Sequence, residues 1–129
     1  MDRVRRRAPS LLAVLFVASG VAHLLSPRTF EPLIPSWLPH PRTIVYTSGI
    51  AEIVCSAGLS KRTRWGRAAS VLLLLAIFPG NIQMAVTASR VSSGRWTLRR
   101  ILAISRLFLQ LPLVWAALQC EGPATTASK

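Results

Sequence analysis

The chain has 129 residues, of which 51% are hydrophobic, and its 16 lysines and arginines against four acids give a formal net charge of +12. The basic residues lie at the ends of long apolar runs rather than along one soluble surface, so the charge does not indicate a nucleic-acid-binding protein. The sequence contains no Ser/His/Asp set, metal-ligand cluster or glycine-rich phosphate loop that would indicate a catalytic centre.

Four apolar runs follow one another along the chain, at residues 10–25, 43–59, 68–89 and 101–119. As helices that rise ~1.5 Å per residue they would be roughly 24–33 Å long, close to the ~30 Å hydrocarbon core of a bilayer. The residues between the runs are too few for a soluble domain. We therefore predict a single all-α domain over residues 1–129, a polytopic membrane protein built as a four-transmembrane-helix bundle.

The distribution of lysine and arginine predicts the orientation of these spans. With the N-terminus inside, nine of these residues fall in the inner loop and tails and six in the outer loops. This bias predicts an inner-membrane protein whose tails, residues 1–9 and 120–129, are cytoplasmic. The first run also resembles a cleavable signal peptide, but cleavage would remove a span whose polar residues match those of the others.

The connection at residues 26–41 contains five prolines among apolar side chains. Because proline blocks a continuous helix, we expect an ordered Pro-rich outer cap between helices 1 and 2, with Trp37 at headgroup level. The inner loop at residues 60–67 carries four basic residues and is expected to contact anionic lipid headgroups.

The second run is organised around one carboxylate, Glu52. In a helix, residues three and four positions away share its face, and these are all small or weakly polar: Ser48, Gly49, Cys55 and Ser56. The opposite face is apolar: Ile50, Ile53, Val54 and Ala57. An ionisable group within a span is costly and rarely faces lipid, so we expect the other spans to supply its partners.

Each of the other spans contains polar residues at a similar depth. They are His23 in the first, Asn81 in the third, and Arg106 with Gln110 in the fourth. Counted from the outer ends at ~1.5 Å per residue, all fall in the outer half of the membrane. Helix breaks are predicted at Pro79–Gly80 and Pro112, beside this polar intramembrane centre.

Two interpretations of this centre remain open. Glu52 and Arg106 could form a buried ion pair, braced by Gln110 and Asn81, that fixes the register of the helices. Alternatively, the residues could line a pocket that opens outward through His23 and binds a headgroup, a quinone or a small solute. A single buried histidine indicates neither a haem nor a metal site, and Cys55 and Cys120 are expected as buried free thiols.

Five short motifs occur in order over residues 10–119, and together they resemble the DoxX-like (DoxX/MauE) membrane proteins of bacteria. They are H-x3-P-x2-F (His23, Pro27, Phe30), IP-x2-LP-x-P (Ile34, Pro35, Leu38, Pro39, Pro41), SG-x2-E (Ser48, Gly49, Glu52), FP-x-NI-x-MA (Phe78, Pro79, Asn81, Ile82, Met84, Ala85) and R-x3-Q (Arg106, Gln110). One departure is Phe108, where a proline is expected between the arginine and the glutamine.

The resemblance implies a four-helix membrane bundle with a redox connection. The family takes its name from a small subunit of a thiosulfate:quinone oxidoreductase, and related members are linked to oxidative-stress complexes or to maturation of periplasmic redox enzymes. We therefore expect an accessory protein, not an enzyme on its own, that assembles with a redox enzyme partner and is linked to a quinone. The alternative is a protein that binds or transports a quinone, lipid or small solute. The sequence indicates no particular oligomeric state.

Overall fold

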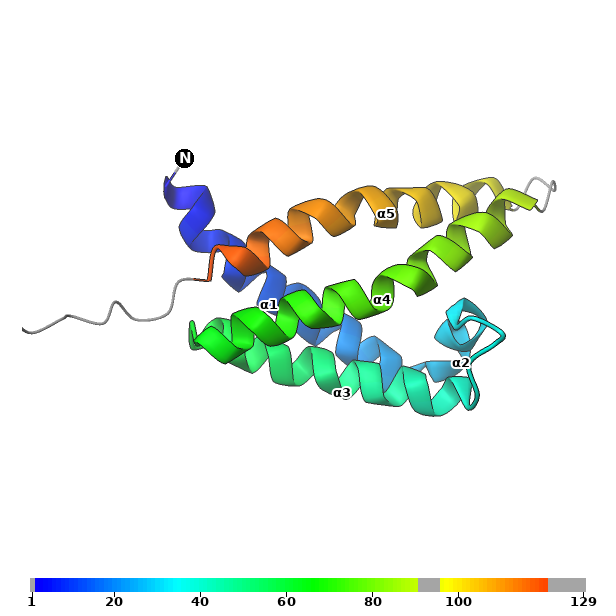
Figure 1. Cartoon of the computed structure of the whole chain (residues 1–129), viewed down its shortest axis with the longest axis horizontal. Coiled ribbons are helices and arrows are strands. Elements are labelled where there is room, and N and C mark those ends of the chain that lie inside the picture. The colour runs from blue at the N-terminus through cyan, green and yellow to red at the C-terminus, as the bar shows by residue number, and fades with distance from the viewer. Residues whose placement is uncertain (1, 91–95, 121–129) are drawn as a thin grey trace, which may run out of the picture.

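The protein is described by a computed structural model that covers residues 2–90 and 96–120 (Figure 1). Its elements are α1 (Asp2–Leu25), α2 (Pro27–Phe30), the 3-10 helix η1 (Glu31–Leu33), α3 (Pro41–Ser60), α4 (Arg64–Arg90) and α5 (Trp96–Leu118). Within these residues the chain forms helices and no strand, which confirms the all-α prediction. The four apolar runs coincide with α1, α3, α4 and α5.

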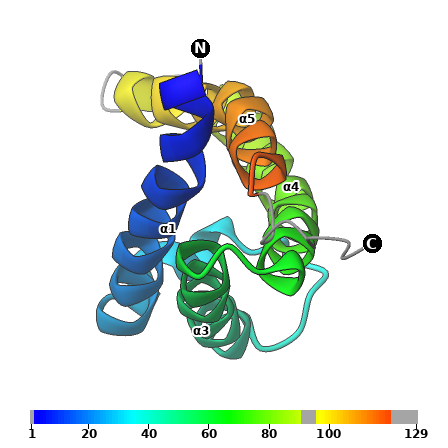
Figure 2. The same ribbon diagram turned by 90° about the vertical axis from the view of Figure 1, so that its left-hand side faces the viewer.

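The four long helices form a bundle in which chain neighbours run in opposite directions (Figure 1). Viewed along the bundle, they follow the order α1, α3, α4, α5 around a ring (Figure 2). The most extensive packing joins α1 to α3 and α4 to α5, and further contacts join α3 to α4 and α1 to α5. The bundle thus consists of two helix pairs set against each other.

The turn between α3 and α4 is tight because two glycines lie against each other. A Cβ atom on Gly66 would lie only 2.3 Å from the carbonyl carbon of Gly58. The amide of Thr63 donates to the Gly58 carbonyl, and Arg62 adopts a left-handed conformation with φ 52°. This arrangement lets α4 start directly alongside the end of α3.

The apolar core lies at the end of the bundle that holds the α3–α4 turn. It is built from residues of all four long helices and from Cys120, which follows α5: Ala8, Leu12, Ala13, Phe16, Cys55, Leu59, Leu74, Ala116, Ala117 and Cys120. Both cysteines are free and buried, as the sequence predicts. A much smaller apolar cluster around Ala85 joins α4 to α5 toward their other ends.

Much of the apolar surface of the bundle faces outward. Large exposed hydrophobic side chains occur on every long helix, among them Val14, Leu15, Ile50, Val54, Leu72, Leu75, Phe108 and Leu111. Among the residues that the structure describes, three helices are long and apolar enough to cross a membrane: Arg3–Leu25, Pro41–Ser60 and Arg64–Val86. The described part of α5 holds a shorter apolar stretch, Ile104–Leu118.

The proline-rich connection is folded over one end of the bundle (Figure 1). Pro27 opens α2 and Pro32 lies in the first turn of η1, positions where the missing N–H of proline has no helical partner to lose. The connection packs against α1, α3 and α4, and an Arg42–Glu31 ion pair with Nε and Oε1 3.7 Å apart ties it to the start of α3. It is therefore an ordered cap.

The predicted helix breaks do not end the helices. Pro79 and Gly80 lie inside α4, and Pro112 lies inside α5. A proline removes a single donor from the hydrogen-bond ladder, and the turns on either side of it remain helical. The prediction that the helices open at Pro79–Gly80 and at Pro112 is therefore wrong, because α4 and α5 continue through these residues.

Candidate functional site between α1 and α3

Glu52 is buried in the bundle with only 5% of its surface exposed. The residues that share its face, Gly49, Cys55 and Ser56, are buried too, whereas Ile50 and Val54 on the opposite face are about half exposed. This confirms the small-residue face predicted around Glu52, but Ile53, predicted on the opposite face, is half-buried and lies against Gly20 of α1. The small residues face the interior of the bundle, and the carboxylate of Glu52 lies on the same face.

Close approach of α1 to α3 places the partners of Glu52 within reach. At Gly20 an added Cβ atom would lie 2.6 Å from the carbonyl oxygen of Gly49, so the two main chains touch there. Small residues of this kind allow backbone-to-backbone helix contacts in membrane bundles. Ser19 and His23 flank this contact on α1, and Glu52 lies one turn along α3.

Three side chains meet at this contact. The hydroxyl of Ser19 donates to Oε1 of Glu52 at 3.1 Å. Nδ1 of His23 lies 3.2 Å from Oε2 of the same carboxylate. Ser19 and His23 are one helical turn apart on α1, so both face α3. The carboxylate thus has one neighbour for each of its oxygens.

The hydrogen bonds assign the proton on the His23 ring. Nδ1 lies 2.8 Å from the main-chain carbonyl oxygen of Ser19, which can only accept, so Nδ1 carries a proton and donates to it. In the neutral ring Nε2 is then left as an acceptor. Among the described residues Nε2 has no hydrogen-bond partner, and the side chain as a whole is 16% exposed.

Oε2 of Glu52 is buried and accepts no hydrogen bond from the described residues. Its distance of 3.2 Å from Nδ1 of His23 allows electrostatic attraction, but the Nδ1 proton points to the Ser19 carbonyl instead. An acceptor that is buried and unfilled is costly, and in a native structure it often marks a place for a water or a ligand. Glu52 therefore retains an unused acceptor beside His23.

Phe30 covers the histidine. Its ring stacks on that of His23 with centroids 4.1 Å apart and planes inclined by 30°. Because Phe30 ends α2, the folded cap reaches the polar site directly. The sequence motifs contain both residues, but only the fold shows that they touch.

A second polar group lies between α4 and α5. Gln110 is buried, its Oε1 accepts from Nδ2 of Asn81 at 2.9 Å, and its Nε2 donates to the carbonyl oxygen of Leu74. No hydrogen bond or ion pair among the described residues joins this group to Glu52. The single polar layer expected from the sequence is therefore two groups, one in each helix pair.

Arg106 is on the surface of α5 rather than at the carboxylate. Within the described residues, the ion pairs of the structure are His23–Glu52 and Arg42–Glu31, and none joins Glu52 to Arg106. Of the two interpretations of the polar centre, the Glu52–Arg106 ion pair is therefore not found among the described residues, where His23 is the ion-pair neighbour of Glu52. The bond from Ser19 to Glu52 was not predicted from the sequence, in which the position of Ser19 one helical turn before His23 was the available signal.

The chemistry of the site is that of a pair of hydrogen-bonding groups. It offers an unfilled carboxylate oxygen and an imidazole nitrogen, with an aromatic ring over the latter. No group of three His, Cys, Asp or Glu side chains gathers as a metal site anywhere in the described part of the chain.

The family model named Domain of unknown function (DUF8561) matches residues 12–121. The chain belongs to the DUF8561 family. The matched range contains both polar groups and the cap, so the candidate site of this DUF8561 member lies wholly within the family domain. Searches of curated proteins and of solved structures gave no match.

Proposed function

We propose that this DUF8561 protein is a four-span integral membrane protein of the bacterial inner membrane, with α1, α3, α4 and α5 as its spans. Two observations support this: three of the helices are long and apolar enough to cross a bilayer, and every long helix exposes large apolar side chains. Apolar surface of this extent is unfavourable in water and favourable in lipid. The resemblance to DoxX-like proteins supports the bacterial assignment.

In this proposal both tails are cytoplasmic and the cap of α2 and η1 is on the outer side. The start of α1, the α3–α4 turn and the end of α5 lie at one end of the bundle, and the cap lies at the other (Figure 1). The first of these ends carries the arginine-rich start of α1 and the Lys61–Arg64 turn, which agrees with the positive-inside rule. A C-terminal green fluorescent protein should fluoresce in cells, whereas a C-terminal periplasmic phosphatase should be inactive.

We infer that the protein serves a membrane redox system by holding a quinone or quinol head at His23 and Glu52. The observation that carries this proposal is the buried, unfilled Oε2 of Glu52 beside the imidazole. A quinol hydroxyl can donate to Oε2 or to Nε2 of His23, and the apolar exterior of the helices suits its isoprenoid tail. The redox chemistry itself is assigned to a partner enzyme, as the DoxX-like resemblance suggests.

The decisive experiment is a binding titration of the purified protein in lipid nanodiscs with a short-chain quinol. Glu52→Gln keeps the shape of the side chain but removes the charge, and we expect it to weaken binding about 10- to 100-fold, the range of one hydrogen bond to a charged group. Glu31→Gln is the matched control, because it removes an acid on the cap outside the site. Ser19→Ala tests the site without altering a charge.

Unchanged quinol affinity in folded Glu52→Gln protein would overturn the quinol site. Equal loss of quinol binding in Glu31→Gln would show that the net charge of the protein, rather than the site at Glu52, determines quinol affinity. If a small polar solute competes with the quinol and binds more tightly, the same site would instead support the alternative function, a solute-binding protein.

A further inference from the structure

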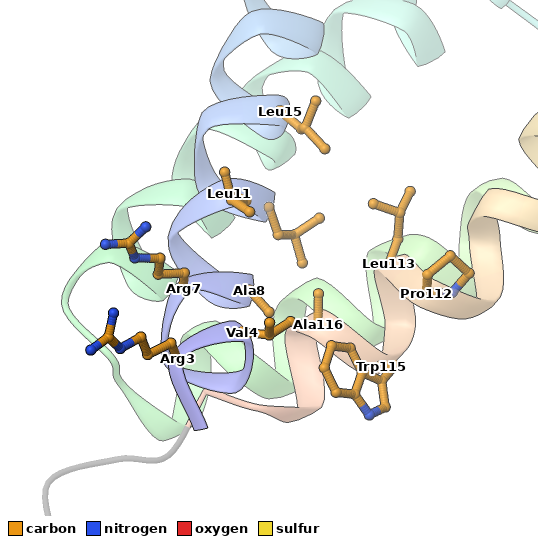
Figure 3. A pocket seen from close by; sticks show the side chains of 11 residues that line it. Arg3, Val4, Arg7, Ala8, Leu11, Leu15, Pro112, Leu113, Trp115 and Ala116 are labelled. Atoms are coloured by element: carbon orange, nitrogen blue, oxygen red, sulfur yellow. The ribbon is translucent and has the colours of Figure 1, made fainter. Parts of the chain in front are cut away.

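A groove of about 370 Å³ runs between α1 and α5 (Figure 3), and neither His23 nor Glu52 lines it. Its lining is almost entirely apolar: Val4, Ala8, Leu11, Leu12, Leu15, Pro112, Leu113, Trp115 and Ala116. Arg3 and Arg7 complete the lining. The groove thus combines a long apolar surface with two cations.

The cations are at one end of the groove. Arg3 and Arg7 lie one helical turn apart on the same face of α1, near its start. At ~1.5 Å per residue, Leu15 lies roughly 18 Å beyond Arg3 and roughly 12 Å beyond Arg7 along the helix. In Figure 3 both arginine side chains extend away from Leu113 and Trp115. Their stems therefore border the apolar surface and their guanidinium groups reach beyond it.

The four arginines at the start of α1 differ in their contacts. Nε of Arg5 donates to Oε1 of Gln119 at 3.0 Å, and the carbonyl of Arg6 accepts from Arg62. Arg3 and Arg7 have no hydrogen-bond or ion-pair partner among the described residues. Arg5 uses its side chain to fasten the helix to the rest of the bundle, and Arg6 does so through its main chain. Arg3 and Arg7 are the two arginines that line the groove, so their guanidinium groups are available there for an anion.

We propose that the groove between α1 and α5 binds one anionic phospholipid, with an acyl chain along Leu11 and Leu15 and the phosphate at Arg3 and Arg7. The charge pattern decides the occupant: guanidinium groups pair well with phosphate, and the apolar floor matches an acyl chain. A soluble anion would leave the apolar surface unfilled, and an apolar helix would leave both cations without a partner. Trp115 at the same end is well placed at the lipid–water interface.

This proposal rests on the four-span membrane location but not on the quinol site. A variant with Trp37, Trp65 and Trp96 replaced by phenylalanine keeps Trp115 as the only tryptophan, and this residue lines the groove. The protein is placed in nanodiscs that contain brominated phosphatidylglycerol or brominated phosphatidylcholine at equal mole fraction. We expect stronger quenching of Trp115 by the anionic lipid.

Two variant pairs isolate the two parts of the groove. The double variant Arg3→Gln and Arg7→Gln should reduce the preference for phosphatidylglycerol by about fivefold per arginine. The double variant Lys61→Gln and Arg64→Gln removes the same charge at the same end of the bundle and should leave this preference unchanged. Leu11→Phe narrows the groove without altering charge and should also reduce quenching. Val14→Phe is its control, because Val14 is equally exposed on α1 but does not line the groove.

Equal quenching by both lipids would overturn the proposal, and so would an equal loss of preference in the Lys61/Arg64 variant. A chain that does not enter nanodiscs would instead refute the membrane location, so the two failures can be told apart. Loss of quenching with Leu11→Phe but not with Val14→Phe would support an acyl chain in this groove.

Discussion

The main chains of α1 and α3 touch at Gly20 and Gly49, and a Cβ atom on Gly20 would lie 2.6 Å from the Gly49 carbonyl oxygen and 2.8 Å from a side-chain carbon of Ile53. The first of these neighbours is backbone and cannot move aside without separating the helices. This contact sets the distance between Glu52 and its partners on α1. The polar site therefore depends on two residues that carry no polar side chain.

Gly20→Ala should lower the free energy of unfolding by about 1–3 kcal/mol, the usual cost of overpacking a close contact. The measurement is unfolding in mixed micelles with increasing sodium dodecyl sulfate. Gly80→Ala is the control: its Cβ atom would meet only the Leu33 carbonyl oxygen at 3.7 Å, so the gain in helix propensity should leave stability unchanged or slightly higher. Equal stability of the two variants would contradict the proposed role of the contact.

A double-mutant cycle between His23→Leu and Glu52→Gln should give a coupling free energy of about 1–3 kcal/mol, because each side chain faces the other at 3.2 Å. The same cycle with Arg106→Gln in place of His23→Leu should give a much smaller coupling, since no hydrogen bond or ion pair among the described residues joins Arg106 to Glu52 and Arg106 is exposed. Both cycles are read from unfolding in the same micelles. Strong coupling of Glu52 to Arg106 would restore the ion pair expected from the sequence.

Gln110→Leu should destabilise the protein by about 1–3 kcal/mol, because it leaves Asn81 and the Leu74 carbonyl without their buried partner. Gln83→Leu makes the same chemical change on α4 at an exposed position and should have little effect. Thermal unfolding in detergent measures both. A neutral Gln110→Leu would show that the bonds of this glutamine contribute little to the α4–α5 pair.

Cys120 should react very slowly with maleimide in the folded protein. Its side chain is fully buried, and burial raises the pKa of the thiol, an effect that exceeds the lowering by Arg62 and Arg67. Because the reactive form is the thiolate and the pKa is raised, labelling should still be slow at neutral pH and should accelerate only as the pH rises above the ordinary range of a thiol.

Denaturation without reductant should expose two maleimide-reactive thiols per chain, because Cys55 and Cys120 are both free. Recovery of no reactive thiol under these conditions would indicate a disulfide and revive a thiol-redox function. Mass spectrometry of the labelled chain gives the count directly.

The sequence alone determined the helical class, the four long helices and the inward face of Glu52. These follow from local rules: apolar length defines each run, and a 3.6-residue period places Gly49, Cys55 and Ser56 beside the acid. The prolines marked the cap correctly, since a short connection rich in proline and apolar residues cannot continue a helix and has apolar surface to bury.

Only the tertiary structure decided which polar residues meet. Depth along a helix, which the sequence gives, places His23, Asn81, Glu52 and Gln110 in one half of the bundle, but it does not give the rotation of each helix or its neighbours. The contact between α1 and α3 at the two glycines places Ser19 and His23 next to Glu52. Asn81 and Gln110 instead bond to each other between α4 and α5. Opposite charge made Arg106 one possible partner of Glu52 in the sequence. The close packing of small residues between α1 and α3 made His23 its neighbour in the structure.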